Sequence, residues 1–124
     1  MQKLFLLSGA ILGGLGVAIG AFGAHALKAM LESTSRTDTF ETAVRYQFYH
    51  ALALLLIGLL LFRLDSKLLH YSGNLMLAGT IIFSGSLYIL CMTGIKWLGA
   101  ITPIGGVLMI AGWVLLAMGI TRQL

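Results

Sequence analysis

Four long apolar segments limit what this chain can fold into more than any other feature of its sequence. They cover about residues 4–27, 43–62, 72–92 and 98–120. About 20 apolar residues in an α-helix cross the ~30 Å hydrocarbon core of a bilayer. Only 10% of the residues are charged, against about 25% in soluble domains. The sequence therefore predicts a single all-α domain over residues 1–124, an integral membrane four-helix bundle with both termini on the same side.

The eight basic residues lie singly at the ends of the apolar segments, as snorkelling side chains and positive-inside signals do. No basic cluster could follow a phosphate backbone, so nucleic acid is not an expected partner. Four of the eight stand on the side of the termini, namely Lys3, Arg63, Lys67 and Arg122. The opposite side carries Lys28, Arg36, Arg45 and Lys96, or three residues if Arg45 lies inside the bundle. This small difference favours cytoplasmic termini.

The first segment has some features of a secretory signal peptide, with Lys3 before an apolar run and Ala24-His25-Ala26 after it. Its apolar run is longer than the usual 7–15 residues of a signal sequence. We expect this segment to stay in the protein as the first membrane helix.

Small residues follow helical spacing in the first and fourth segments, where they let helix backbones approach closely. The first segment carries Gly9, Gly13, Gly16, Gly20 and Gly23, and the fourth carries Gly105, Gly112 and Gly119. A second small-residue face of the first segment comprises Ala10, Gly14, Ala18 and Ala21. Two such faces predict a central first helix with neighbours on both sides. The glycines can serve packing within one bundle or a homo-oligomer interface, and both readings stay open.

Polar residues gather at the start of the second segment, in the sequence "RYQFYH" of residues 45–50. On a helix, Tyr46, Gln47 and His50 share one face, so we expect this face to point at protein. The opposite face is apolar and is expected to point at lipid; it comprises Val44, Phe48, Ala51, Leu55 and Phe62. Residues of the first and third segments reach similar depths. The predicted polar layer is His25, Arg45, Tyr46, Gln47, Tyr49, His50, Ser84 and Tyr88.

Each member of this layer also has a plain structural interpretation. The tyrosines can form an aromatic belt at the headgroups, and Arg45 can snorkel or pair with Glu41 one turn earlier. An interhelical hydrogen bond would account for His50. No catalytic set is recognisable, because Ser84 and Ser86 have no acidic partner at their depth. We predict no metal site and no cofactor.

Four stretches resemble the recurrent segments of domain-of-unknown-function family 423, which is similar to eukaryotic transmembrane protein 256. They are "GAFGAHAL" (20–27), "YQFYHALALL" (46–55), "FSGSLYIL" (83–90) and "TPIGGVLMIAGW" (102–113). The resemblance implies a four-helix bacterial inner-membrane protein and names no reaction. Its motif positions correspond here to His25, Tyr46, His50, Ser84, Gly85, Tyr88, Pro103, Gly105 and Gly106.

Three functions are compatible with these features. The leading hypothesis is a non-enzymatic membrane protein that packs with itself, with membrane lipids or with partner proteins. An alternative is a small transporter or channel that uses the polar layer around His50 and Arg45, although the first segment lacks the carboxylate of small drug-proton exporters. A third hypothesis is a redox module in which His25 and His50 hold haem or quinone.

Overall fold

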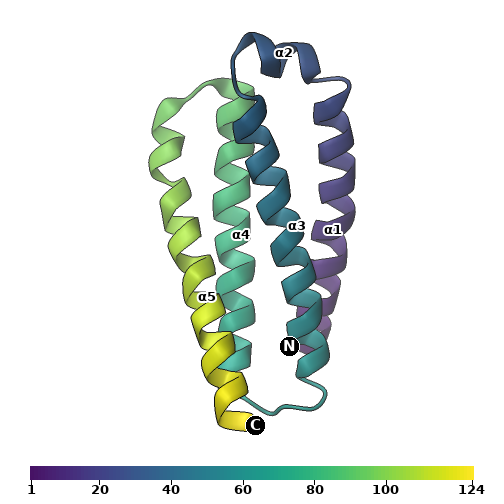
Figure 1. The fold of residues 1–124 in the computed structure, drawn as a ribbon, viewed down its shortest axis with the longest axis vertical. Helices are drawn as coiled ribbons and strands as arrows, with labels where there is room; N and C mark the ends of the chain where they lie inside the picture. Colours follow the sequence, from purple (N-terminus) through teal and green to yellow (C-terminus); the bar gives the residue numbers. More distant parts are fainter.

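The computed structural model describes residues 1–124 as an all-helical bundle (Figure 1). Its elements are α1 (Gln2–Ala24), α2 (Lys28–Ser33), α3 (Thr37–Leu60), α4 (Lys67–Thr93), the 3₁₀-helix η1 (Lys96–Ala100) and α5 (Thr102–Gln123). Four helices are long and apolar enough to cross a membrane. Both chain ends lie at the same end of the bundle, as the sequence predicts (Figure 1).

The helices α3 and α4 begin before the apolar spans that the sequence suggests. α3 starts at Thr37 and α4 at Lys67, so each carries a polar first turn or more ahead of its apolar part. A helix needs no apolar side chains to continue into the interface, because its backbone hydrogen bonds are internal. The polar start of α3 therefore belongs to the same rigid rod as its membrane part.

The long helices follow the order α1, α3, α4, α5 across the bundle (Figure 1). α1 packs along α3 and meets α4 mainly at one place, where Phe5 lies against Gly73, while α5 packs along α4. The prediction of a central first helix is therefore wrong, and α1 is an edge helix. Small residues permit close approach but do not say how many neighbours a helix has.

The glycines lie where helices approach each other. In α1, Gly9 faces Ala51 and Leu55 of α3, Gly16 faces Phe48, and Gly23 faces Phe40. Gly13 and Gly20 are looser: a Cβ at Gly13 would lie 4.0 Å from Ala51 Cβ, and one at Gly20 would lie 3.4 Å from Val44. In α5, Gly105 faces Gly79 and Phe83, Gly112 faces Met76, and Gly119 faces Leu68 and Leu69.

These contacts overturn one expectation about α3. Its apolar face was expected to point at lipid, yet Ala51 is buried and Phe48 and Val44 are half-buried against α1. Phe62 alone of that set is strongly exposed. A lipid-facing surface and a glycine-facing surface have the same apolar composition, so composition does not separate them.

The apolar core lies between α1, α3 and α4. Its fully buried side chains are Phe5, Leu54, Ile57, Leu69 and Met76. A smaller cluster of Leu31, Phe40 and Cys91 ties the short helix α2 to the start of α3 and the end of α4. This second cluster gives the loop end of the bundle a fixed shape.

Gly94 ends α4 in the left-handed conformation, with φ of 73°, and lies under the guanidinium of Arg36. Arg36 also donates to the Cys91 carbonyl at 3.4 Å, so a basic side chain covers the negative end of the helix. We expect Gly94→Ala to lower the free energy of unfolding by about 2 kcal/mol, because alanine is strained at this φ and meets Arg36. Unfolding in mixed micelles measures the loss.

Gly99→Ala is the control for this prediction, since its new methyl group would meet only Leu90 at an ordinary 3.7 Å. Equal stability losses in the two variants would refute the argument.

Candidate functional site

The centre of the polar layer is Gln47, a buried residue of α3. Its amide nitrogen donates to the Leu12 carbonyl of α1 at 2.8 Å. Its amide oxygen accepts from the Tyr88 hydroxyl of α4 at 2.5 Å. One side chain therefore joins three helices, and both ends of its amide are used.

His50, one turn further along α3, is also buried. Its Nδ1 lies 2.7 Å from the Tyr46 carbonyl, and its Nε2 lies 3.0 Å from the indole nitrogen of Trp113 on α5. A carbonyl only accepts and an indole N–H only donates, which assigns the neutral tautomer with the proton on Nδ1. Both ring nitrogens are therefore hydrogen-bonded within the protein.

Two further members of the predicted layer bind α3 to α4. The Ser84 hydroxyl donates to the Ala43 carbonyl at 2.7 Å within the buried part of the interface. The Tyr46 ring stacks on Phe83 with centroids 5.0 Å apart, but the side chain is 40% exposed, so it does not point into the protein as Gln47 and His50 do. The structure thus brings together Tyr46, Gln47, His50, Ser84 and Tyr88.

The other predicted members lie outside this cluster. His25 is exposed at the end of α1, while His50 hydrogen-bonds to α5, the opposite edge of the bundle. Arg45 is exposed and pairs with Glu41 at 3.2 Å, as the sequence suggests. The Tyr49 ring is exposed and touches Tyr46 only at its outer side, with centroids 5.8 Å apart.

The arrangement is that of a closed hydrogen-bond network. His70 Nδ1 is the single buried side-chain nitrogen or oxygen without a partner in the chain. The buried hydroxyls also point at protein acceptors: Ser72 donates to the Gly112 carbonyl at 2.6 Å, and Ser86 meets Thr102 at 2.6 Å. These two bonds connect α4 and α5 where apolar packing alone would be weakly directional.

Sequence reasoning missed Trp113, the partner that holds His50. The available signal was that Trp113 carries the only side-chain hydrogen-bond donor between Pro103 and Ile120. A buried histidine on one membrane helix needs such a donor or acceptor on another. The carbonyl acceptors at Leu12 and Ala43 had no signal, because every residue carries that group.

The model of a family described as "Protein of unknown function (DUF423)" matches residues 19–106. This range includes the whole polar cluster of Tyr46, Gln47, His50, Ser84 and Tyr88. A UPF0382 membrane protein of Staphylococcus aureus is 50% identical over 115 residues, 93% of each chain. The UPF0382 membrane protein YwdK of Bacillus subtilis is 42% identical over 124 residues, 99% of this chain and 100% of that protein.

No solved structure matches the chain. The family match covers well over half of the sequence, and the relatives are membrane proteins that align along nearly their full length. The chain therefore belongs to the DUF423 family of membrane proteins.

Proposed function

We propose that this protein is a non-enzymatic membrane protein whose activity is assembly, with a second copy of itself as the partner. The observation that carries the proposal is an uncovered small-residue face on α1. Ala10, Gly14, Ala18 and Ala21 are all exposed, and a Cβ added at Gly14 would meet nothing within 4 Å. α1 also has the smallest buried share of the four membrane-crossing helices.

The spacing of this face suits helix-helix contact. Its first three members stand at i, i+4 and i+8, the repeat that lets two membrane helices approach closely. Larger exposed side chains stand beside it, among them Ile11 and Val17. Copies inserted with the same orientation would present identical faces to each other, as a two-fold interface requires.

The polar cluster supports the non-enzymatic part of the proposal. Gln47 and His50 use their polar atoms inside the protein, and no serine in the cluster faces a base. No observation supports the transporter hypothesis or the redox hypothesis. The His50 Nε2 atom, which both would use, accepts a hydrogen bond from Trp113.

Gly14→Leu is the test of the assembly face. We expect it to leave the fold intact, because the site is open in the single chain. We expect it to weaken self-association by about tenfold or more, because a close helix contact has no room for a leucine. Energy transfer between donor-labelled and acceptor-labelled copies in lipid vesicles measures the association.

Gly85→Leu is the matched control, since Gly85 of α4 is likewise a helical glycine with nothing within 4 Å of an added Cβ. It should associate like the unmodified protein. Equal transfer in all three proteins would overturn the proposed interface.

We further propose a bacterial inner-membrane location with both termini in the cytoplasm. The basic residues on the terminal side, Lys3, Arg63, Lys67 and Arg122, are exposed and form no ion pair. On the other side only Lys28 and Lys96 are exposed without an ion pair, because Arg36 and Arg45 are engaged with the Cys91 carbonyl and with Glu41. Free positive charge close to membrane helices favours the cytoplasmic face.

A fluorescent protein fused to the C-terminus should therefore fluoresce, and an alkaline phosphatase fused there should be inactive. The reverse pattern would contradict this orientation.

A further inference from the structure

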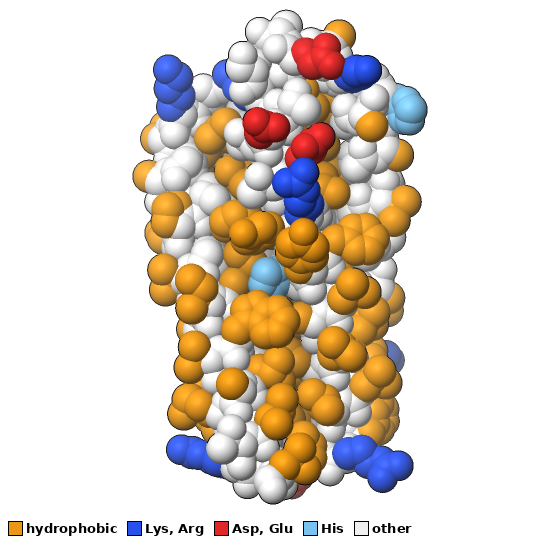
Figure 2. All heavy atoms as spheres, in the orientation of Figure 1, with side chains coloured by type: hydrophobic (Ala, Val, Ile, Leu, Met, Phe, Trp, Pro, Cys, Tyr) orange, Lys and Arg blue, Asp and Glu red, His pale blue; other side chains and the backbone are white.

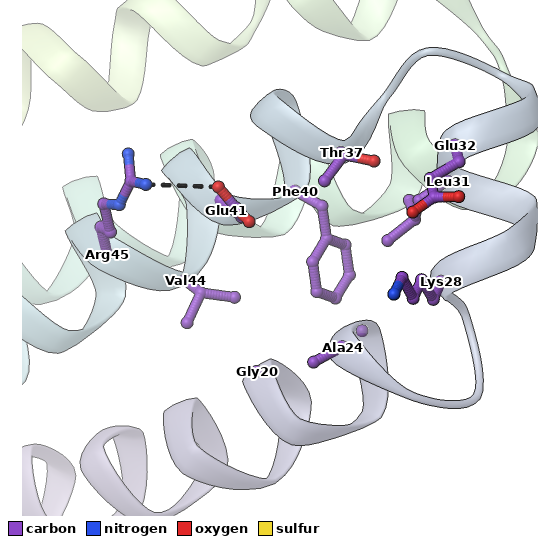
Figure 3. A pocket seen from close by; sticks show the side chains of 11 residues that line it. Gly20, Ala24, Lys28, Leu31, Glu32, Thr37, Phe40, Glu41, Val44 and Arg45 are labelled. Carbon is purple, nitrogen blue, oxygen red and sulfur yellow. Dashed lines mark hydrogen bonds and ion pairs between the residues drawn. The ribbon is translucent and has the colours of Figure 1, made fainter.

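A cavity of about 560 Å³ lies at the corner where α1 ends, α2 crosses and α3 begins (Figure 3). Its apolar floor is formed by Gly20, Gly23, Phe40 and Val44. Its rim carries two basic and two acidic side chains, Lys28, Glu32, Glu41 and Arg45. Figure 3 shows Lys28 and Glu32 on α2 at one end of the cavity and Glu41 and Arg45 on α3 at the other end, where the Arg45 guanidinium turns toward Glu41 and away from α1.

The charges on the rim are only partly used within the chain. Arg45 and Glu41 form the single ion pair, at 3.2 Å, and both side chains are more than half exposed. Lys28 and Glu32 have no ion pair or side-chain hydrogen bond in the chain. The guanidinium of Arg45 has five N–H donors in all, so most of them stay available to a ligand.

We expect the cavity to lie at the depth of the lipid headgroups, because it is at the end of the apolar α1 span. It is where the apolar span of α1 ends and the first charged residues after it appear. Figure 2 shows acidic and basic side chains gathered at this end of the bundle, with a broad hydrophobic surface below them. Further along the same two helices, Val17 of α1 and Leu52 of α3 are exposed apolar side chains. Val17 stands three residues before Gly20, and Leu52 stands eight residues after Val44.

We propose that this cavity binds the headgroup of a phospholipid that carries both a phosphate and a primary ammonium group. Lys28 and Arg45 would hold the phosphate, Glu32 and Glu41 would accept hydrogen bonds from the ammonium, and the acyl chains would follow Val17 and Leu52. A purely anionic headgroup has no cationic group of its own to place against Glu32 and Glu41. A quaternary ammonium would offer no N–H to those carboxylates.

The headgroup cavity is separate from the assembly face, although Val17 borders that face and also the proposed acyl-chain path. The cavity uses Gly20 and Gly23 of α1, whereas the proposed interface between copies uses Ala10, Gly14, Ala18 and Ala21. Lipid binding should therefore persist in the Gly14→Leu variant, even where that variant is a monomer. The two proposals can fail independently.

The test is native mass spectrometry of the full-length protein taken from vesicles with equal amounts of three lipids of the same acyl composition. The lipids are phosphatidylethanolamine, phosphatidylglycerol and phosphatidylcholine. We expect one retained lipid per chain, with phosphatidylethanolamine enriched about fivefold over each of the others. This factor corresponds to the free energy of two partly exposed ion pairs.

Two variants tie the enrichment to the cavity. The double variant Lys28→Gln, Arg45→Gln should lose the retained lipid, and Glu32→Gln should reduce the preference for phosphatidylethanolamine over phosphatidylcholine. Lys96→Gln is the matched control, because Lys96 is an exposed lysine at the same end of the bundle and does not line the cavity. It should behave like the unmodified protein.

Enrichment of phosphatidylglycerol, equal retention of the three lipids, or a preference that survives the Lys28→Gln, Arg45→Gln variant would each overturn the proposal.

Discussion

Gly105→Ala is expected to lower the free energy of unfolding by about 3 kcal/mol, at the upper end of the range for an overpacked core. A Cβ at this position of α5 would lie 2.5 Å from the Phe83 nitrogen and 2.7 Å from the Gly79 carbonyl oxygen. Both are backbone atoms of α4, so no side-chain rotation can make room. The two helices would have to separate along their whole contact.

The control for this prediction is Gly106→Ala, a substitution at the next residue of α5. Its added methyl group would meet only the Phe83 ring, at 3.9 Å. Both substitutions gain the same helix propensity, about 1 kcal/mol, so their difference isolates the collision with α4. Unfolding by sodium dodecyl sulfate in mixed micelles, followed by tryptophan fluorescence, gives both values; similar stabilities would refute the close α4–α5 contact.

Gln47→Leu should destabilise the bundle by about 2 kcal/mol, the loss of two hydrogen bonds to other helices. The variant keeps a side chain of similar size but leaves the Tyr88 hydroxyl and the Leu12 carbonyl without their partner. Tyr88→Phe removes the hydroxyl as well. The double variant should therefore lose about 1 kcal/mol less than the sum of the two single variants.

The same cycle separates a structural polar layer from a hydrated route through the bundle. If water reached Gln47 and Tyr88, it would replace each lost partner, and the two losses would simply add. Strict additivity, with small single effects, would contradict the closed network described above.

Much of the architecture follows from the sequence, because lengths of apolar sequence are tied to the thickness of a bilayer. The four crossings, the shared side of the termini and the Arg45–Glu41 pair all come from local spacing. The order in which the helices pack does not follow from local spacing. The glycine stripe of α1 is compatible with one neighbour or two, and only the three-dimensional packing shows that α3 takes it alone.

The polar cluster was likewise predictable only in part. Gln47 and His50 stand out because polar groups inside a membrane need partners. Their partners include the backbone carbonyls of Leu12 and Tyr46, which the sequence cannot indicate because every residue has a carbonyl. The prediction includes His25 because of its depth and Tyr49 because it flanks the polar face, and neither criterion tells which way a side chain turns. The corner cavity had no sequence signal, since its charges come from two helices joined by a turn.

The most direct test of the central claim is native mass spectrometry of the unmodified full-length protein, released gently from its membrane. Assembly through the outer face of α1 requires an oligomer, present also for Gly85→Leu and lost for Gly14→Leu. A monomer under conditions that retain bound lipid would contradict the claim and leave the small-residue face of α1 to the bilayer.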